Sequence, residues 1–382
     1  MAPRISTFDD WVDTFHEWQK DIGFPLHLLE GFQFDAKYDE PANDEIFFGD
    51  YKGEKRWRRV IDIPDQRIRD ALQHLIVYQA DTEFGSVEQQ RRLAETAPTG
   101  YDLESLVRVM REEMRHGWQM CHVLVNHFGY SGRVEAQKQL ERRSWKNTRL
   151  LGSFNVEVDN WLDFFTYTEF IDRDGKFQLR MLLHSAFMPL AASMGPMLKE
   201  EAFHLGTGHT GLKRIVAAGI VPVELIQKWF HKWIPTAYDL FGVDNSSSAE
   251  WAYVWGVKGR FDEDTNTTVA DRESLNDYAR SLYHEDIVNH VDALNRLLPE
   301  SSPKLTVPDP KFNRAIGSYA GQSWTIAGEP VDPGKYPDYL ASVLPSRKDQ
   351  EALAALCRDP SWILPPPTHP RADALRRSEA RK

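Results

Sequence analysis

The sequence predicts a mainly α-helical protein built around a four-helix bundle that carries a carboxylate site for two metal ions. Glu-x-x-His occurs twice in the 382 residues, at Glu113 to His116 and at Glu201 to His204. Each pair lies in a long stretch whose apolar residues recur every three to four positions, which is typical of an amphipathic helix. Residues three apart share one helix face, so each pair aims a carboxylate and an imidazole at one point.

Two further helices with inward-facing acids complete the predicted bundle. Glu83 continues a stripe of apolar residues that includes Ile76, and Asp172 lies seven residues after Phe165 on another. Glu83 and Glu113 are 30 residues apart, and Asp172 and Glu201 are 29 apart, the offset expected for facing positions on antiparallel helices. One carboxylate on each of two helices and Glu-x-x-His on the other two is the ferritin-like di-metal arrangement.

Charge explains why metal ions are expected among these six residues. Burying four unpaired carboxylates is prohibitive, whereas two divalent cations neutralise them. Mixed carboxylate and imidazole ligation suits iron or manganese. Glu169 lies one turn before Asp172 on the same helix face, so it could replace or supplement Asp172 as a metal ligand. Glu112 and Glu200 are expected to face solvent. Five other histidines are interpreted as packing or ordinary residues, not ligands: His122, His127, His209, His284 and His290.

The predicted elements follow the chain in order. Residues 1–60 form a short amphipathic helix, capped by Ser6 or Thr7, and an irregular segment packed on the bundle. Residues 61–218 form the bundle, whose first helix begins at Pro64 and whose second ends at Gly129. A polar crossover with one short helix follows the second helix. Residues 219–365 form a cover with helices near 223–240 and 272–298 and a strand-and-loop stretch at 302–345. Residues 366–382 form a mobile tail.

Composition excludes several classes of function. The chain has 46 basic and 57 acidic residues, a formal charge of −11 and a pI near 5.7, so neither nucleic acid nor a membrane surface is an expected partner. Its two cysteines match no zinc or iron–sulfur spacing and supply no disulfide framework. No segment has the long apolar core of a signal peptide or an uninterrupted membrane span. We therefore expect a cytoplasmic protein.

Longer motifs around the six residues resemble a known family. QADTEFGSVEQQ contains Glu83, EEMRHGWQM contains Glu113 and His116, FIDRDGKFQL contains Asp172, and KEEAFHLG contains Glu201 and His204. With LERRS, KFNRAIGSYAG and WILPPP, these motifs resemble the oxygenase component of benzoyl-coenzyme A epoxidase, a non-haem diiron monooxygenase family. The departures are Glu169 in place of an aromatic residue, Phe203 in place of a histidine, and a shorter link at 258–270.

The resemblance implies both the chemistry and the partners. It implies two Fe ions held by the six residues, with Glu113 and Glu201 bridging them, and O2 as co-substrate. It also implies a substrate acyl group carried as a coenzyme A thioester and electrons from a separate NADPH-dependent reductase. Epoxidation and hydroxylation both stay open, as does the acyl group. Acyl specificity is predicted to arise at the three departures from the family pattern.

Residues for binding the substrate are predicted separately. Gln79 lies one turn before Glu83 on the same stripe, so we predict that its amide lines the substrate chamber. The anionic coenzyme A requires local cations, for which the candidate clusters are Arg91–Arg92, Arg142–Arg143 and Lys311–Arg314.

Two other functions use a similar bundle. In the radical subunit of ribonucleotide reductase, a tyrosine usually follows the first Glu-x-x-His by about one turn. Met120 occupies that position here, which weighs against this function. An iron-storage or iron-binding ferritin-like protein needs little beyond its four helices, whereas this chain continues for a further long segment that a substrate cover explains better.

Overall fold

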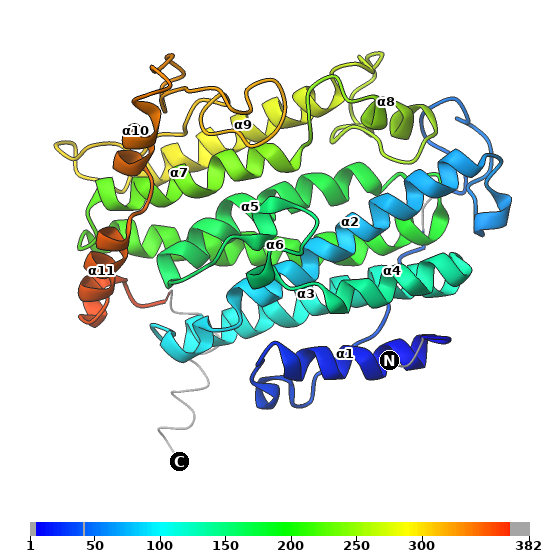
Figure 1. Ribbon diagram of the computed structural model, residues 1–382, viewed down its shortest axis with the longest axis horizontal. Coiled ribbons are helices and arrows are strands. Elements are labelled where there is room, and N and C mark those ends of the chain that lie inside the picture. The colour runs from blue at the N-terminus through cyan, green and yellow to red at the C-terminus, as the bar shows by residue number, and fades with distance from the viewer. Residues whose placement is uncertain (1–4, 41–42, 367–382) are drawn as a thin grey trace, which may run out of the picture.

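A bundle of four long helices forms the centre of the computed structural model, which describes residues 5–40 and 43–366 (Figure 1). The bundle helices are α2 (Gln66–Gln90), α3 (Gly100–His127), α5 (Trp161–Leu182) and α6 (Met188–Ala218). Helix α2 packs along α3 and α5 packs along α6, and contacts between α3 and α6 join the two hairpins. The predicted mainly α-helical bundle is confirmed, and its helices fall within residues 61–218.

Local chemistry at the helix ends explains where these helices begin and end. The side chains of Thr99 and Asn160 accept hydrogen bonds from backbone amides in the first turns of α3 and α5. Gly219 caps the end of helix α6, and its φ of 67° is the left-handed conformation that glycine adopts at low cost. Pro64 was expected to open α2, but Asp65 caps that helix and Pro64 precedes the cap.

Helix α1 (Phe8–Asp21) packs against α3 and α4 (Gly129–Glu141), as expected for an N-terminal helix that covers the bundle. Thr7 caps it through a reciprocal capping box. Its buried aromatic residues stack on one another and reach Phe84 of α2, whose ring centroid lies 5.0 Å from that of Trp18. Helix α4 is the short helix predicted in the crossover.

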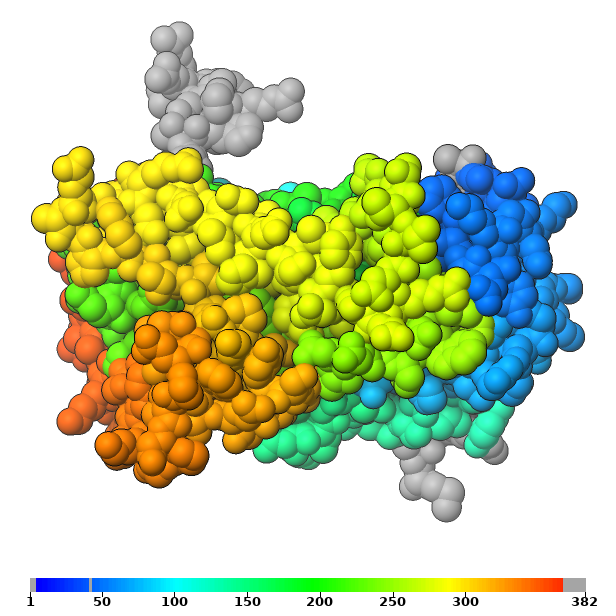
Figure 2. All heavy atoms as spheres, turned by 90° about the horizontal axis from the view of Figure 1, so that it is seen from above, coloured from blue at the N-terminus to red at the C-terminus, as the bar shows by residue number. Residues whose placement is uncertain are grey.

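A second layer of helices covers the other side of the bundle. Its members are α7 (Val223–Leu240), α8 (Ser247–Val254), α9 (Leu275–Asn295), α10 (Tyr336–Val343) and α11 (Arg347–Leu356). Helix α7 packs on α5, and α9 packs on both α5 and α6. Figure 2 shows the yellow residues around α9, with the lime and orange segments beside them, spread across this face. Short 3-10 turns complete the connections: Leu26–Leu29, Val60–Asp62, Leu93–Thr96, Ser144–Lys146, Gly152–Asn155 and Pro360–Trp362.

The cover differs from the expectation in its short elements. Helices α7 and α9 match the predicted patterns, but α8, α10 and α11 were not predicted, because eight to ten residues are too few for a clear helical period. Where strands were expected at 302–345, the structure has loops, α10 and one isolated bridge between Trp324 and Pro330. The predicted tail at 366–382 lies, apart from its first residue, outside the described part of the chain. Within that part, every helix is too short or too polar to cross a bilayer.

Two glycines let α6 approach α5 closely. A Cβ atom added to Gly208 would lie 2.6 Å from the backbone nitrogen of Glu169 and 3.0 Å from the backbone oxygen of Phe165. A Cβ atom on Gly211 would overlap the Phe165 ring. The backbone contact at Gly208 therefore sets the distance between the helix that carries Asp172 and the helix that carries Glu201.

We expect Gly208→Ala to lower the free energy of unfolding by about 1–3 kcal/mol, because a methyl group must push two backbones apart. Thermal or denaturant unfolding measures this change. Gly206→Ala is the matched control in the same helix: its Cβ meets no atom within 4 Å, so helix propensity alone predicts a gain of up to about 1 kcal/mol. Equal stability of the two variants would contradict the close-packing argument.

Candidate metal centre

The six residues predicted from the sequence meet in the middle of the bundle. They are Glu83 of α2, Glu113 and His116 of α3, Asp172 of α5, and Glu201 and His204 of α6, and each is at most 5% exposed. Their ligand atoms form two groups, within each of which the atoms lie within 4.8 Å of one another: Glu83, Glu113 and His116 in one, and Glu113, Asp172 and His204 in the other. Glu113 belongs to both groups.

Glu201 links the two groups from the opposite helix. One of its carboxylate oxygens, Oε1, lies 3.4 Å from Nδ1 of His116, and the other, Oε2, lies 3.5 Å from Nδ1 of His204. Glu83 Oε2 is 3.3 Å from the same His116 nitrogen, and Glu113 Oε1 is 3.6 Å from the same His204 nitrogen. Both imidazoles therefore present Nδ1 to a common centre that four carboxylates surround.

The electrostatics of this centre show a shortage of positive charge. Burial, together with Glu83 and Asp172, raises the pKa of Glu113 well above 4.5. Burial and Glu201 raise the pKa of Asp172 well above its ordinary value. Burial disfavours a charged imidazole, but Glu201 and Glu112 outweigh it and raise the pKa of His204 to about 10. Without metal ions, the centre therefore holds protons that it would not hold in water.

The donor set fits two divalent metal ions. Four inward-facing atoms find no hydrogen-bond partner among the described residues: Nδ1 of His116, Nδ1 of His204, Oδ2 of Asp172 and Oε2 of Glu201. Buried polar atoms are almost always paired, so these four need a ligand. Two divalent ions would neutralise the four carboxylates, and carboxylate with imidazole is a donor set for iron.

Two glutamates outside the predicted set orient the histidines. Glu200 Oε2 lies 2.9 Å from Nε2 of His116, and Glu112 Oε2 lies 3.1 Å from Nε2 of His204. Each acid reaches across to the histidine of the other Glu-x-x-His helix. An outer carboxylate that accepts the Nε2 proton leaves the Nδ1 lone pair free to bind a metal ion. The expectation that Glu112 and Glu200 face solvent was wrong: Glu112 is 9% exposed, and the buried Arg115 donates to the Glu200 carboxylate from both Nε and Nη2.

A repeated sequence feature could have identified these two acids. Both motifs read Glu-Glu-x-x-His, with the extra glutamate immediately before the predicted ligand. Adjacent residues on a helix point about 100° apart, so the first glutamate of each motif faces the neighbouring helix when the second faces the bundle axis. In a bundle, a side chain that points toward a neighbouring helix is not exposed to solvent.

We expect Glu112→Ala to weaken metal binding by about 10–100-fold, the usual effect of losing the carboxylate behind a ligating histidine. Anaerobic titration with ferrous iron measures this effect. Glu104→Ala, at an exposed position of the same helix, is the control and should bind iron as the wild type does. An unchanged affinity in Glu112→Ala would show that Glu112 does not support His204.

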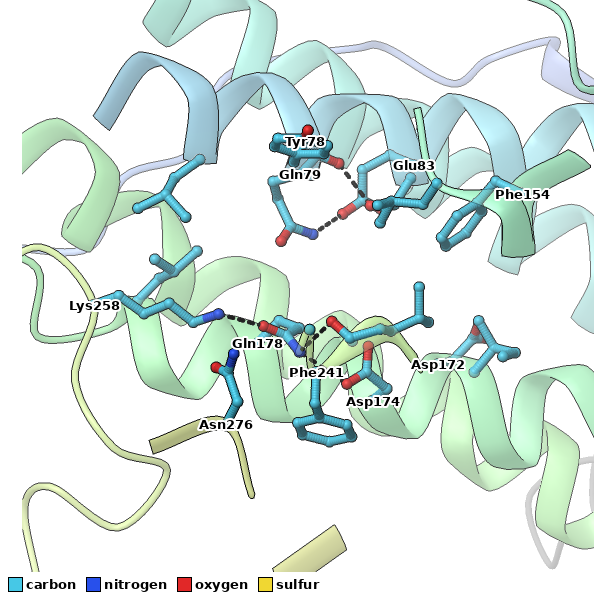
Figure 3. Close-up of a pocket in the computed structure, with 18 of the residues that line it drawn as sticks. Tyr78, Gln79, Glu83, Phe154, Asp172, Asp174, Gln178, Phe241, Lys258 and Asn276 are labelled. Carbon is cyan, nitrogen blue, oxygen red and sulfur yellow. Dashed lines mark hydrogen bonds between the residues drawn. The ribbon is translucent and has the colours of Figure 1, made fainter. Parts of the chain in front are cut away.

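A cavity of about 300 Å³ opens beside the six-residue centre, between α2, α5 and the cover (Figure 3). Glu83, Glu113, Asp172 and Glu201 form part of its wall. Apolar and aromatic residues form much of the remaining wall, among them Phe154, Tyr167, Ile171, Leu182, Leu240 and Phe241. Gln79, which was predicted to line a substrate chamber, lines this cavity, and its Nε2 donates to Glu83 Oε1 at 2.5 Å.

A cation that was not predicted lines the same cavity. Lys258 donates to Gln178 Oε1 at 2.7 Å, and Gln178 donates in turn to Asp174 Oδ1 at 2.9 Å. Burial lowers the pKa of Lys258, and burial raises the pKa of Asp174 to about 7. In Figure 3, Lys258 lies at the opposite end of the cavity from Asp172.

Arginines of the cation clusters proposed from sequence form ion pairs with acidic residues of the same chain. Arg142 pairs with Asp81, Arg143 lies 3.8 Å from Glu88, and Arg314 pairs with Asp239. These arginines hold loops to the bundle and do not line the cavity. Lys258, at the start of the shortened 258–270 link, is the cation that lines this cavity.

Unlike Lys258 in the shortened link, the other two departures from the family pattern, Glu169 and Phe203, lie outside the cavity. Glu169 points away from Asp172, toward His209 and His290. Phe203 lies under the Arg108 guanidinium, whose central carbon is 3.6 Å from the ring centroid. Neither residue lines the cavity, so the prediction that they set acyl specificity loses its basis. His290, interpreted from the sequence as an ordinary residue, has Glu169 as an acidic partner, with Nδ1 3.2 Å from Oε1.

Comparison with known proteins identifies the family of the chain. Residues 61–303 match the family model of the phenylacetic acid catabolic protein. The chain is also 34% identical to benzoyl-CoA oxygenase component B of Aromatoleum evansii, over 94% of this chain and 91% of that relative. The matched region contains the whole bundle and all six centre residues, and the resemblance seen in the sequence motifs is confirmed. The chain therefore belongs to the phenylacetic acid catabolic protein family.

Proposed function

We propose that this protein is an O2-dependent non-haem diiron monooxygenase that inserts one oxygen atom into an acyl group carried as a coenzyme A thioester. The observation that carries the proposal is a buried centre of four carboxylates and two imidazoles, with unpartnered donor atoms, open to an apolar cavity. The relative from Aromatoleum evansii is a component of a benzoyl-CoA oxygenase, which supports both the reaction class and the thioester.

The six residues would hold the metal ions in two halves. Glu83 and His116 would bind one ion, Asp172 and His204 the other, and Glu113 and Glu201 both, since each of these two carboxylates faces both groups. A bound pair of ferrous ions would supply the electrons and the binding site for reducing O2 at the cavity wall. Glu112 and Glu200 keep the two imidazoles in the tautomer that presents Nδ1.

The cavity suits an acyl group rather than a whole coenzyme A. Its volume of about 300 Å³ is at the lower end of the range for small-molecule sites. Apolar side chains such as Phe154, Ile171 and Phe241 exclude water from the acyl group and hold its carbon atoms beside the carboxylate wall. The nucleotide part of the thioester would then remain outside, and the thioester carbonyl would lie between Lys258 and the metal centre.

Gln79 is proposed as a positioning residue. Its amide nitrogen holds Glu83, and its amide oxygen points into the cavity in Figure 3. We expect Gln79→Leu to lower kcat by about tenfold or more without loss of iron, because a hydrogen bond to a charged group contributes roughly 1.5–3 kcal/mol. Gln73→Leu, on the same helix and hydrogen-bonded to Ser131 away from the cavity, is the control. Unchanged kinetics and product in Gln79→Leu would rule out this role.

Turnover with defined substrates tests the proposed function. The protein is loaded anaerobically with ferrous iron, supplied with a chemical reductant, and mixed with O2 and a panel of aromatic and aliphatic acyl-coenzyme A thioesters. Mass spectrometry is expected to show one product that has gained a single oxygen atom, which derives from labelled O2. Absence of oxygenated product across the panel, with the iron centre assembled, would contradict the proposal.

The electron donor is proposed to be a separate NADPH-dependent reductase. A pyridine-nucleotide fingerprint is a Gly-x-Gly-x-x-Gly that follows a strand and opens a helix. Gly206 to Gly211 has this spacing but lies inside helix α6, so it does not fit that role. The relative's name describes it as one component of an oxygenase. Reductases from benzoyl-coenzyme A and phenylacetate oxygenase systems can be tested for restoring NADPH-dependent turnover.

A further inference from the structure

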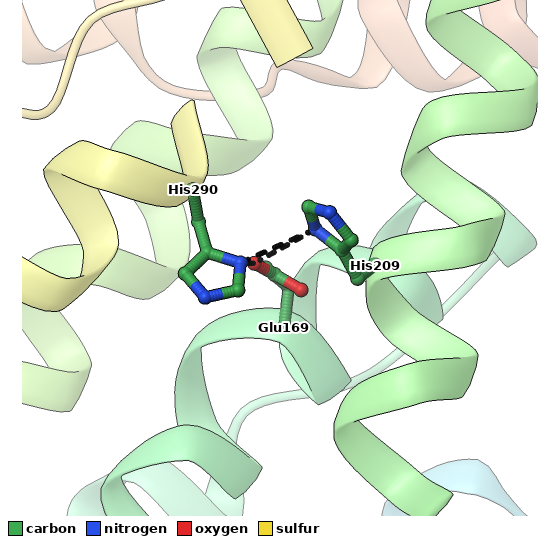
Figure 4. Close-up of side chains that lie close together, drawn as sticks. All are labelled: Glu169, His209 and His290. Atoms are coloured by element: carbon green, nitrogen blue, oxygen red, sulfur yellow. Dashed lines mark hydrogen bonds and ion pairs between the residues drawn. The ribbon is translucent and has the colours of Figure 1, made fainter. Parts of the chain in front are cut away.

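A second cluster of potential metal ligands lies outside the six-residue centre, where the cover meets the bundle (Figure 4). Glu169 comes from α5, His209 from α6 and His290 from α9. Glu169 is fully buried, whereas the side chains of His209 and His290 are 19% and 30% exposed. We propose that these three residues form a separate site for a single divalent ion of the Zn²⁺ type, which fastens α9 to the bundle.

The distances between the donor atoms favour a tetrahedral ion. Glu169 Oε1 lies 3.4 Å from Nδ1 of His209 and 3.2 Å from Nδ1 of His290, and the two Nδ1 atoms are 3.4 Å apart. Ligands at the usual zinc distances of 2.0–2.1 Å in a tetrahedron are separated by about 3.3–3.4 Å. The three donor atoms therefore already form one face of a zinc tetrahedron, and two imidazoles with one carboxylate are ligands that zinc prefers.

Two observations point to an additional ligand at this cluster. The second carboxylate oxygen of Glu169, Oε2, is buried and finds no hydrogen-bond partner among residues 5–40 and 43–366. The two Nδ1 atoms face each other, so at most one of them can carry a proton toward the other. A cavity of about 630 Å³, lined by His209 and His290, adjoins the cluster and has room for the water that completes a zinc site.

Arg173 competes with a metal ion for two of the proposed ligands, Glu169 and His290. Its Nη2 donates to Glu169 Oε1 at 3.1 Å and lies 3.3 Å from Nδ1 of His290, while its Nη1 donates to Asp286 at 2.9 Å. Asp286 and Glu169 together outweigh the charge of Arg173 by one, so the surroundings remain negative and accept a cation. Asp286 also lies 3.8 Å from Nε2 of His290, where it can orient that imidazole.

The proposed ion would connect three elements that few other polar contacts join. Helix α9 is held to α5 by the Tyr283 hydroxyl, which donates to the Phe170 carbonyl at 2.9 Å, and by the pair of Arg173 with Asp286. An ion that binds only the folded protein stabilises it by an amount that rises with the logarithm of the ion concentration. It would fix the cover against α5 at Glu169, three residues from Asp172. The site shares no residue with the six-residue centre and does not depend on the proposed oxygenase function.

Zinc titration of the full chain tests the proposal. Zn²⁺ is titrated into metal-free wild-type protein and into His209→Asn and His290→Asn, in which the amide can keep a hydrogen bond at the Nδ1 position. His284→Asn, on α9 beside Tyr238, is the matched control. We expect the wild type and the control to bind one more Zn²⁺ per chain than either cluster variant, and to gain more thermal stability on zinc addition.

A second readout separates this site from the bundle centre. Co²⁺ in tetrahedral coordination absorbs visible light more strongly than Co²⁺ in a carboxylate-rich site of higher coordination number. The wild type, the control and Glu113→Gln should show the intense spectrum, and the two cluster variants should lose it. Equal Zn²⁺ stoichiometry and equal Co²⁺ spectra in the wild type and the cluster variants would overturn the proposal and leave a hydrogen-bonded network centred on Arg173.

Discussion

Glu113→Gln is expected to lose about two iron ions per chain relative to the wild type while the bundle stays folded. Glu113 is the carboxylate common to both groups of ligand atoms, so its replacement removes a ligand from each ion. The neutral amide also lowers the negative charge that attracts the ions. Iron is measured after anaerobic loading and removal of weakly bound metal.

The stability of the metal-free variant is expected to change in the opposite direction from its iron binding. In the metal-free protein, burial and the neighbouring carboxylates disfavour the charged form of Glu113 and raise its pKa. A neutral amide therefore suits this position of the metal-free protein at least as well as a carboxyl group does, and the unfolding midpoint of metal-free Glu113→Gln should be at or above the wild-type value. Glu104→Gln is the control for both measurements. Full iron content in Glu113→Gln would refute its assignment as the shared ligand.

Lys258→Met is expected to lower kcat/KM for the thioester substrate by about 10–100-fold, the equivalent of one hydrogen bond to a charged group. Lys258 is the cation that the cavity presents at the end away from Asp172, held by Gln178. Methionine keeps much of the length of the side chain and removes the charge. Because Lys258 lies apart from the six centre residues, the iron content should not change.

Comparison of thioester and free acid shows what Lys258 recognises. The wild type should prefer the thioester, and Lys258→Met should lose most of that preference. Lys213→Met, at an exposed position of α6, should behave as the wild type. Turnover of the free acid at the rate of its thioester in the wild type would refute the coenzyme A assignment, and an unchanged Lys258→Met would refute the role of this residue.

The bundle and its six inward residues could be predicted because both depend on helical periodicity. A residue such as Glu113 in an apolar stripe must face the bundle axis, whatever the remaining chain does. The spacing of Glu83 and Glu113 follows in the same way from two antiparallel helices of similar length. These properties are local, so the sequence carries them without knowledge of the tertiary contacts.

The residues around the centre are brought there by tertiary contacts, which leave no periodic pattern in the sequence. Lys258 follows α8 in a loop and reaches the cavity because the neighbouring Gly259 amide donates to the Met181 carbonyl at the end of α5. His290 meets Glu169 only because α9 packs across α5 and α6. Glu112 and Glu200 were misassigned because a polar residue beside a ligand was assumed to face water, whereas each faces a neighbouring bundle helix.

Anomalous diffraction from crystals of the iron-loaded wild-type protein tests the central claim most directly. We predict two iron peaks about 3.5–4 Å apart in the bundle, both within bonding distance of Glu113 and Glu201, with Glu83 and His116 on one ion and Asp172 and His204 on the other. A single peak among the six residues, or iron only elsewhere in the chain, would contradict the diiron account.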